Sequence, residues 1–278
     1  MSEEKEMSFL DHLEELRWHV VKSVIAIGVG MIVAFINIRW IFENIVFAPA
    51  RINFPTFKYM CQFGKLVGAE ESLCAQPFDF IVQSRNMTGQ FMMSITASVV
   101  IGLIVAFPYV FWQIWSFIKP GLKQNEKKNS SGAVTAVTFL FLLGVAFGYF
   151  ILSPMTIWFL ASYSISDMIK NEFDITSYVS TVVGMVIGSG LLFQFPVVVY
   201  FMTKVGMLTP QFMRKFRKHA IVVILILGAV VTPSPDPFSM MLISTPLYFL
   251  FEISIIISAI VVRKQRKLEE QEVRADQL

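Results

Sequence analysis

Long unbroken apolar runs are the feature that most constrains the fold of this chain. Hydrophobic residues make up 55% of the sequence and charged residues only 15%, whereas soluble domains carry about 25% charged residues. A chain this apolar cannot cover its own surface with polar groups, so lipid must solvate much of it. In lipid the backbone must satisfy its own hydrogen bonds, which leaves α-helices or a closed barrel. The runs do not alternate as barrel strands do, so we predict an all-α membrane protein.

The apolar runs predict six transmembrane helices, arranged as a concave bundle. They cover residues 20–38, 87–109, 134–152, 179–201, 220–231 and 240–262. Most are close to the roughly 20 residues that cross about 30 Å of hydrocarbon. The fifth run is shorter, because about 12 residues reach only about 18 Å. It either crosses a thinned bilayer or uses flanking residues.

The distribution of basic residues predicts the orientation of the spans. If the N-terminus lies inside, the inner segments hold seventeen of the 23 Lys and Arg residues. Because cytoplasmic loops are enriched in these residues, both termini are expected in the cytoplasm. We therefore expect one six-span core over residues 1–262, with a long outer loop at 39–86, and a charged cytoplasmic tail at 263–278.

The only two cysteines, Cys61 and Cys74, both lie in the predicted outer loop. Cysteine pairs in an oxidising compartment tend to form disulfides, so a bridge between them is expected. The alternative is two unrelated free thiols. Neither cysteine lies near a histidine in the sequence, and no metal site or cofactor is expected.

Catalytic patterns are weak in this chain. It has no Gly-rich phosphate loop of the Walker type, so ATP hydrolysis is not expected. An intramembrane protease needs a serine and a base at one depth, but Ser189 is mid-span and His219 lies near an interface. His12 and His19 could share a helix face with Glu15 as a metal site, although a solvated face beside the membrane fits them better. We predict no enzymatic activity and no catalytic residue.

Two polar residues fall at membrane depth. Gln194 lies in the fourth predicted span and Glu252 in the sixth. An ionisable group at that depth is costly and is a functional candidate. The alternative for Glu252 is a protonated carboxyl group that is hydrogen-bonded to a neighbouring helix.

Carboxylates also lie on the otherwise basic inner side. Asp11, Glu14, Glu15 and Arg17 precede the first span, and Glu126 follows the second. Each carboxylate could simply pair with a Lys or Arg on the same side. As a group they offer acceptors for guanidinium groups, which bind carboxylates in bidentate fashion.

These residues belong to a series of motifs that resembles the TatC family of the twin-arginine protein translocase. The N-terminal motif is SFLDHLEELR at residues 8–17. Further motifs follow in order: Ala48-Pro49, Phe107-Pro108, QIWSFIKPGL at 113–122 with Glu126, AFGYF at 146–150, FQFP at 193–196, Thr232-Pro233 with Asp236, and LFE at 250–252. Together they cover roughly residues 8–255.

The resemblance implies a receptor that recognises the twin-arginine signal peptide of folded proteins and supports their export, driven by the proton-motive force. It implies a multi-pass protein of the bacterial cytoplasmic (inner) membrane, single-span TatA/TatB-type partners, homo- and hetero-oligomers, and no nucleic-acid partner. The implied signal-peptide residues are Glu15, Glu126, Glu14, Arg17 and Phe117. The implied structural or functional positions are Pro49, Pro108, Tyr149 and Asp236.

One position departs from the family pattern. Many relatives carry Glu where this chain has Gln194, and a neutral amide cannot exchange a proton, so only a hydrogen-bonding role is expected there. The alternative functions are a secondary transporter, which predicts polar groups converging at mid-membrane and related halves, and the intramembrane protease considered above.

Overall fold

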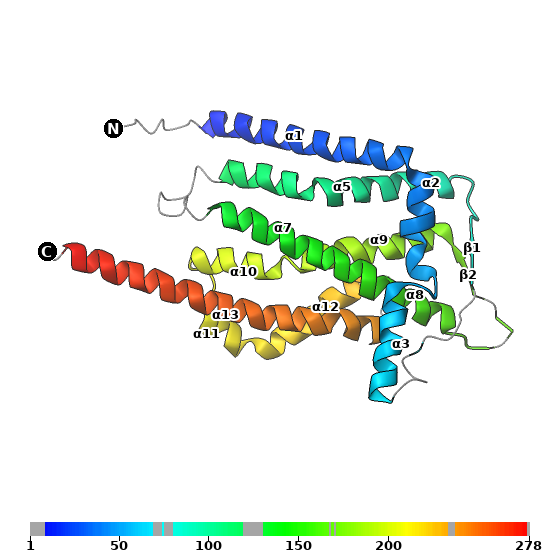
Figure 1. Ribbon diagram of the computed structural model, residues 1–278. Coiled ribbons are helices and arrows are strands. Elements are labelled where there is room, and N and C mark those ends of the chain that lie inside the picture. The colour runs from blue at the N-terminus through cyan, green and yellow to red at the C-terminus, as the bar shows by residue number, and fades with distance from the viewer. Residues whose placement is uncertain are drawn as a thin grey trace. The chain divides into compact units, whose positions relative to one another are not determined.

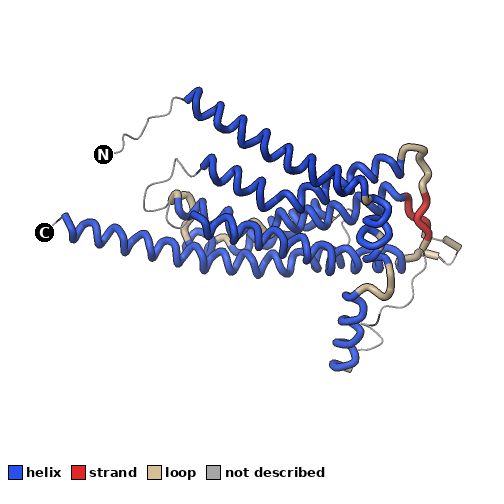
Figure 2. Tube along the Cα trace, turned by 45° about the horizontal axis from the view of Figure 1, so that its top comes forward, coloured by secondary structure: helices blue, strands red, loops and turns tan. Residues whose placement is uncertain are grey.

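The computed structural model describes residues 9–68, 74, 80–118, 130–166, 168–169, 171–232 and 237–276, and most of them are helical (Figures 1 and 2). The chain divides into two compact units. The first comprises Met1–Ala48, Ile81–Leu142 and Glu172–Val179. The second comprises Pro49–Phe80, Leu143–Asn171 and Ser180–Leu278.

Two long antiparallel helices, α1 (Phe9–Ile36) and α5 (Gly89–Ile118), form the centre of the first unit (Figure 1). They meet where Gly30 faces Gly102. A Cβ atom added at Gly102 would lie only 2.6 Å from the backbone nitrogen of Met31. Glycine is therefore required for the two backbones to approach this closely. The short helices α2 (Ile38–Ile41) and η1 (Phe42–Val46) follow α1.

A two-stranded parallel sheet, which the sequence did not predict, lies at the end of the first unit. Strand β1 (Ile81–Gln83) pairs with β2 (Glu172–Asp174), with Val82 opposite Phe173. The carboxylate of Asp174 accepts hydrogen bonds from the hydroxyl and backbone N–H of Thr176 and from the backbone N–H of Arg85. These bonds, the Thr176 hydroxyl first, lower the pKa of Asp174. The pair joins the chain before α5 to the start of α9.

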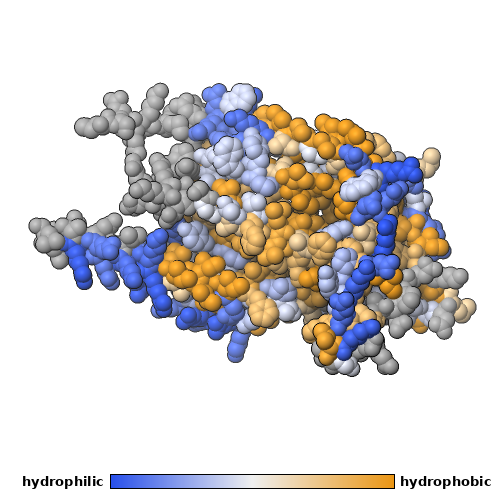
Figure 3. Space-filling model, viewed as in Figure 1, coloured by the Kyte–Doolittle hydropathy of each residue, from blue (hydrophilic) through white to orange (hydrophobic). Residues whose placement is uncertain are grey.

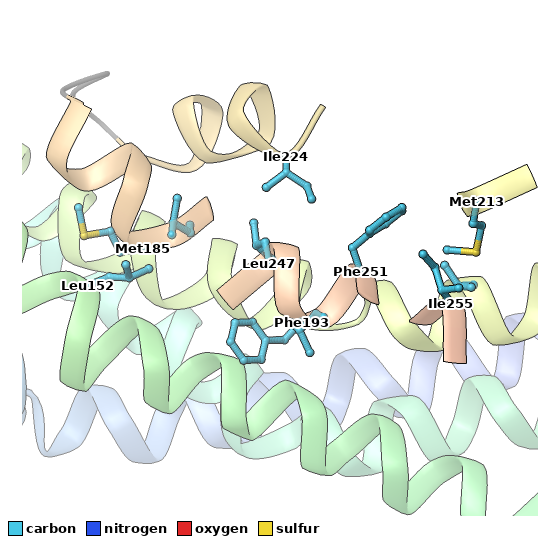
Figure 4. Packing of buried hydrophobic residues seen from close by; sticks show 11 residues of the cluster. Leu152, Met185, Phe193, Met213, Ile224, Leu247, Phe251 and Ile255 are labelled. Atoms are coloured by element: carbon cyan, nitrogen blue, oxygen red, sulfur yellow. The ribbon is translucent and has the colours of Figure 1, made fainter. Parts of the chain in front are cut away.

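The second unit contains a hydrophobic core to which several helices contribute (Figure 4). Its fully buried members include Leu152, Met185 and Ile243. The helices that contribute are the C-terminal end of α7 (Ser130–Phe147), η4 (Gly148–Leu152), α9 (Ile175–Leu192), α10 (Phe195–Lys204), α11 (Pro210–Lys215), α12 (Arg217–Val231) and α13 (Pro237–Asp276). Helix α8 (Ser153–Ser162) belongs to the same unit.

A break separates α9 from α10 at Phe193 and Gln194. Pro196 stands at the start of α10, where it lacks an N–H and disfavours the α conformation of the residue before it. The sequence predicted one continuous fourth span here. The structure instead has two helices, and Gln194 occupies the position that precedes α10.

The surface of the helices is apolar over long stretches. Val24, Ile25, Val29, Ile32 and Val33 of α1 are all more than half exposed, and Figure 3 shows hydrophobic residues over the C-terminal half of α1 and hydrophilic ones along the end of α13. Soluble proteins rarely expose so large an apolar surface to water, whereas lipid solvates such a surface. The all-α membrane fold predicted from the sequence is confirmed.

Five helical stretches of the described chain are long and apolar enough to cross a membrane. They are Leu13–Ile36, Gly89–Ile118, Gly132–Ser162, Ile175–Lys204 and Ser239–Lys267. The fifth predicted span corresponds to α12, whose 15 residues extend about 22 Å at 1.5 Å per residue. The count of six spans, which requires α12 to cross the membrane, and the orientation of the termini therefore stay predictions. Helix α13 continues to Asp276, so the tail predicted to begin at residue 263 extends the last span as a helix.

The predicted outer loop contains short helices. After η2 (Ala48–Ala50), helix α3 (Pro55–Val67) packs its first turn on η4, where the ring of Phe54 lies 5.7 Å from that of Tyr149. A disulfide joins Cys61 of α3 to Cys74. The bridge closes the segment that follows α3 back onto that helix.

Candidate functional site

The contact between α1 and α5 also sets the register of their polar residues. His19 lies eleven residues before Gly30, and Gln113 lies eleven residues after Gly102. Eleven residues make about three helical turns, so His19 and Gln113 return to the faces that meet at the glycines, roughly 16 Å away. In the structure Nδ1 of His19 lies 2.5 Å from Oε1 of Gln113.

A chain of hydrogen bonds extends from this contact along α5. Oε1 of Gln113 can only accept, so the proton lies on Nδ1 of His19. The amide nitrogen of Gln113 in turn donates to the hydroxyl oxygen of Tyr109 at 2.6 Å. The side chain of His19 is only 16% exposed. Tyr109 therefore holds Gln113, and Gln113 in turn holds the imidazole ring between the two helices.

Glu15 and Phe117 flank His19 one turn farther along their helices. Nε2 of His19 lies 4.0 Å from a carboxylate oxygen of Glu15, whose side chain is 36% exposed. The ring of Phe117 meets the imidazole edge to face, with centroids 6.4 Å apart. We call Glu15, His19, Tyr109, Gln113 and Phe117 the α1/α5 ladder. It presents one partly exposed carboxylate beside aromatic rings, an arrangement suited to a guanidinium group.

Of the other residues predicted for signal-peptide binding, the structure describes two. Glu14 and Arg17 lie on α1 with exposed side chains. Glu126 lies outside the described residues, as does Asp236. The structure thus brings together Glu15 and Phe117 from the predicted set, and the roles of Glu14, Arg17 and Glu126 stay predictions.

His19 is not on a solvated face, contrary to the interpretation favoured from the sequence. It was considered only with His12 and Glu15, as part of a helix face beside the membrane. The structure places it against α5, together with Gln113 and Tyr109, which the sequence analysis did not single out as site residues. The equal spacing of His19 and Gln113 from a glycine on each helix was the signal that could have identified them.

Glu252 is paired at the surface of the second unit. One carboxylate oxygen accepts a 2.7 Å hydrogen bond from Arg217 at the start of α12, and the other accepts one from Tyr248 at 3.2 Å. The side chains of Arg217 and Glu252 are 46% and 31% exposed. The guanidinium of Arg217 at 2.7 Å favours an ionised carboxylate over the protonated carboxyl group considered as the alternative above.

The prolines and Tyr149 from the family motifs lie in structural positions. Pro49 is buried in η2, Pro108 lies inside the continuous helix α5, and Tyr149 lies in the π-helical turn η4. A π-helical turn is rare and often conserved near functional sites. None of the three contributes to the α1/α5 ladder.

Ser189 has a packing role. Its buried hydroxyl donates to the carbonyl oxygens of Gly144 and Met185, at 2.8 and 2.6 Å. A Cβ atom at Gly144 would lie 2.6 Å from the carbonyl oxygen of Ser189, so α7 and α9 touch here through their backbones. His219 lines a different cavity, among residues of α10 to α13. The geometry therefore does not assemble a serine and its base.

Comparison with known proteins identifies the family. The family model for the Sec-independent protein translocase protein (TatC) matches residues 11–246. The TatC protein of Blattabacterium sp. subsp. Periplaneta americana is 38% identical over 95% of this chain and 99% of its own length. The TatCy protein of Bacillus subtilis is 30% identical over 94% of this chain and 92% of its own.

Solved structures agree with the sequence relatives. A crystal structure of the twin-arginine translocase receptor TatC in the detergent DDM superimposes with a TM-score of 0.68 at 29% identity, covering 89% of this chain and 99% of that one. A second structure of the receptor gives a TM-score of 0.64 at 28% identity. The chain therefore belongs to the TatC family and is a multi-pass inner-membrane component of the Sec-independent protein translocase, not an enzyme.

Proposed function

We propose that this chain is the receptor that recognises the twin-arginine signal peptide of folded proteins at the cytoplasmic rim of the membrane. Single-span TatA/TatB-type subunits would assemble with it, and the proton-motive force would drive export. Both termini would lie in the cytoplasm, because that orientation keeps most Lys and Arg residues inside. The similarity of the chain to a solved twin-arginine translocase receptor supports this proposal.

The observation that carries the proposal is the partly exposed carboxylate of Glu15 beside His19. Nε2 of His19 lies 4.0 Å from one of its oxygens, an ion pair only when the imidazole is protonated, and the bonds of His19 to Gln113 and of Gln113 to Tyr109 hold the ring. A site ordered before binding loses less conformational entropy when the ligand arrives. An arginine of the signal peptide would meet an oriented acceptor, with the ring of Phe117 beside it.

The second arginine needs a second acceptor, and we assign that role to Glu126. It lies in the first inner loop, directly after α5, whose C-terminal turn carries Phe117. Each charge-assisted hydrogen bond contributes roughly 1.5–3 kcal/mol, and partial exposure lowers this toward about 1 kcal/mol. Losing one carboxylate should therefore weaken binding by roughly tenfold.

The test measures the affinity of an Arg-Arg and a Lys-Lys signal peptide for wild type, Glu15→Ala, Glu126→Ala and the double variant. Lysine lacks the planar guanidinium fork, so wild type should bind the Lys-Lys peptide as weakly as a single variant binds Arg-Arg. The double variant should lose nearly all preference. Glu43→Ala is the matched control, because Glu43 pairs with Arg39 beyond the other end of α1. If the double variant keeps the normal preference for Arg-Arg, the proposal is wrong.

Gln194 does not take part in proton transfer in this proposal. Its amide cannot titrate, so coupling to the proton-motive force must use other groups. The residue lies at the break between α9 and α10, where its backbone carbonyl accepts from Val197 and Val198. We assign it a hydrogen-bonding role in that break.

A further inference from the structure

An apolar cavity of about 340 Å³ lies within the second unit, lined by α10, α11, α12 and α13. Its wall includes Met202 of α10, Phe212 and Phe216 around α11, Val223 of α12 and Phe251 of α13. Several of these side chains are also partly open to the surroundings, with Phe212 at 52% and Val223 at 53% exposure. Because α10 and α13 belong to stretches long and apolar enough to cross a membrane, we expect this opening to face lipid or headgroups.

Basic residues between α10 and α12 adjoin the lining of this α10–α13 cavity in the sequence: Arg214 and Lys215 fall between Met213 and Phe216, and Lys218 precedes His219. Lys204 ends α10, Arg214 and Lys215 end α11, and Lys218 lies in the first turn of α12. Arg214, Lys215 and Lys218 are exposed, and the sequence from 204 to 219 contains no Asp or Glu. His219 lines the cavity itself.

Helix α13 adds to the positive charge. The side chain of Gln265 donates to the carbonyl oxygen of Lys204 at 2.9 Å, which places the basic segment of residues 263–267 beside the end of α10. The acidic group on the facing part of α13 is Glu252. Its two oxygens are taken by Arg217 and Tyr248, so it offsets Arg217 and not Arg214, Lys215 or Lys218.

We propose that this cavity binds one acyl chain of an anionic phospholipid, whose phosphate lies on the rim formed by Arg214, Lys215, Lys218 and His219. An apolar wall cannot recognise a polar solute, and a basic rim repels the cationic end of a signal peptide. Basic pockets between transmembrane helices on the cytoplasmic side are typical sites for anionic headgroups. The charge and the hydrophobicity of the site thus match the two ends of one lipid.

The combination of an apolar wall with basic residues at its edge favours a lipid over a helix of a partner subunit. An extended hydrocarbon chain is much narrower and can enter through the opening near Val223. The site is independent of the α1/α5 ladder, so a failure here leaves the receptor proposal untouched.

The experiment is native mass spectrometry of the full-length protein in detergent, titrated with phosphatidylglycerol and with phosphatidylcholine of the same acyl chains. The rim variant is Arg214→Gln/Lys215→Gln/Lys218→Gln. Its control is Arg39→Gln/Lys58→Gln/Lys65→Gln, which removes the same charge from the outer segment. Val223→Trp fills the opening, and Val222→Trp is its control, because Val222 is equally exposed but does not line the cavity.

Wild type should bind phosphatidylglycerol at least tenfold more tightly than phosphatidylcholine. The rim variant should lose up to about a hundredfold in phosphatidylglycerol affinity, and Val223→Trp should weaken both lipids, while the two controls match wild type. Equal binding of the two lipids by wild type overturns the proposal. Full phosphatidylglycerol affinity in either the rim variant or Val223→Trp also overturns it. So does a photo-crosslinker at position 223 that captures a single-span subunit instead of lipid in membranes.

Discussion

The α1/α5 ladder and the α10–α13 cavity are built from similar helices, but the helices pack closely in the ladder and leave a gap in the cavity. In the ladder, a glycine on each helix lets the backbones touch, and the polar side chains three turns away then bond directly to each other. In the cavity, bulky side chains of four helices leave about 340 Å³ between them. Close contact therefore orders a carboxylate for an ionic ligand, whereas incomplete closure leaves room for a hydrocarbon chain.

The two regions also differ in how their charges are held. Glu15 lies beside His19, which Gln113 and Tyr109 hold in place, so the surroundings of its carboxylate depend on the relation of α1 to α5. Arg214 and Lys215 are exposed on the short helix α11, and Lys218 is exposed in the first turn of α12. Fixed charge gives geometric selectivity, and exposed charge gives attraction with little geometric demand. Changes to packing should therefore damage the ladder most, and changes to charge should damage the cavity most.

The largest expected effect is that of Gly102→Ala. The new Cβ atom would lie 2.6 Å from the Met31 nitrogen and 2.8 Å from the Ile27 carbonyl oxygen, and backbone atoms cannot move aside as side chains do. Overpacking of this kind costs about 1–3 kcal/mol, and we expect the upper end. Thermal unfolding should shift down, and Arg-Arg peptide affinity should fall at least tenfold although the substitution lies roughly 16 Å away.

Gly28→Ala is the matched control for that prediction. A Cβ atom at Gly28 meets nothing within 4 Å, and alanine is favoured over glycine within a helix by about 1 kcal/mol. This variant should be as stable as wild type or slightly more stable, with unchanged peptide affinity. If both alanine variants behave alike, the glycine contact does not set the register of the ladder, and the contrast between the two regions disappears.

The parts of this fold that the sequence predicts follow from hydrophobicity and from charge. The apolar runs correspond to the membrane-crossing helices, and the shortest run corresponds to α12, the one helix of the set that falls below spanning length. The break before Pro196 and the strand pair at Val82 and Phe173 were not predicted. Proline position allows a break without requiring it, and three-residue strands carry too little periodicity to detect.

The candidate site was predicted in part, for a physical reason. Glu15 and Phe117 could be selected because their motifs resemble a family. His19 could not, because its role depends on a residue 94 positions away in the sequence, Gln113, and on the glycine contact that aligns the two helices. Likewise, the sequence placed Glu252 at membrane depth without indicating Arg217 as its partner. Long-range pairing depends on helix packing, which periodicity within one helix does not report.

A smaller effect is expected from Glu252→Lys, which tests whether the stability of the helices around the α10–α13 cavity depends on the Arg217–Glu252 ion pair. Breaking a buried ion pair costs about 3–5 kcal/mol and breaking an exposed one about 0–1 kcal/mol. The pair of Arg217 with Glu252 is between these cases, so we expect a loss of about 2 kcal/mol, seen as lower thermal stability and impaired insertion or export. Glu252→Gln should keep the fold, because the amide oxygen still accepts from Arg217.

The exchange variant Arg217→Glu/Glu252→Arg distinguishes pairing from other causes. It restores opposite charges across the same gap and should recover most of the stability lost in Glu252→Lys. Signal-peptide affinity, measured at the α1/α5 ladder, should stay at the wild-type level in all three proteins. If the lysine variant is as stable as wild type, the position faces water or headgroups, and the pair contributes little.

The smallest expected effect, and the sharpest for the ladder, is that of His19→Ala. Removing the imidazole deletes the 2.5 Å bond to Gln113 and the group that faces Glu15 at 4.0 Å, but leaves the carboxylate itself in place. A net hydrogen bond contributes about 1 kcal/mol, so Arg-Arg peptide affinity should fall about fivefold.

A purely structural loss would weaken Arg-Arg and Lys-Lys peptides equally. A loss of orientation at Glu15 should instead reduce the ratio of the two affinities, because only the planar guanidinium fork requires a fixed acceptor. His19→Gln should restore part of that ratio, since its amide can still donate to Gln113, and Val20→Ala, at an exposed position on the next residue, should leave it unchanged. If the ratio is unaltered in His19→Ala, His19 does not orient Glu15. Order before binding would then not distinguish the α1/α5 ladder from the α10–α13 cavity.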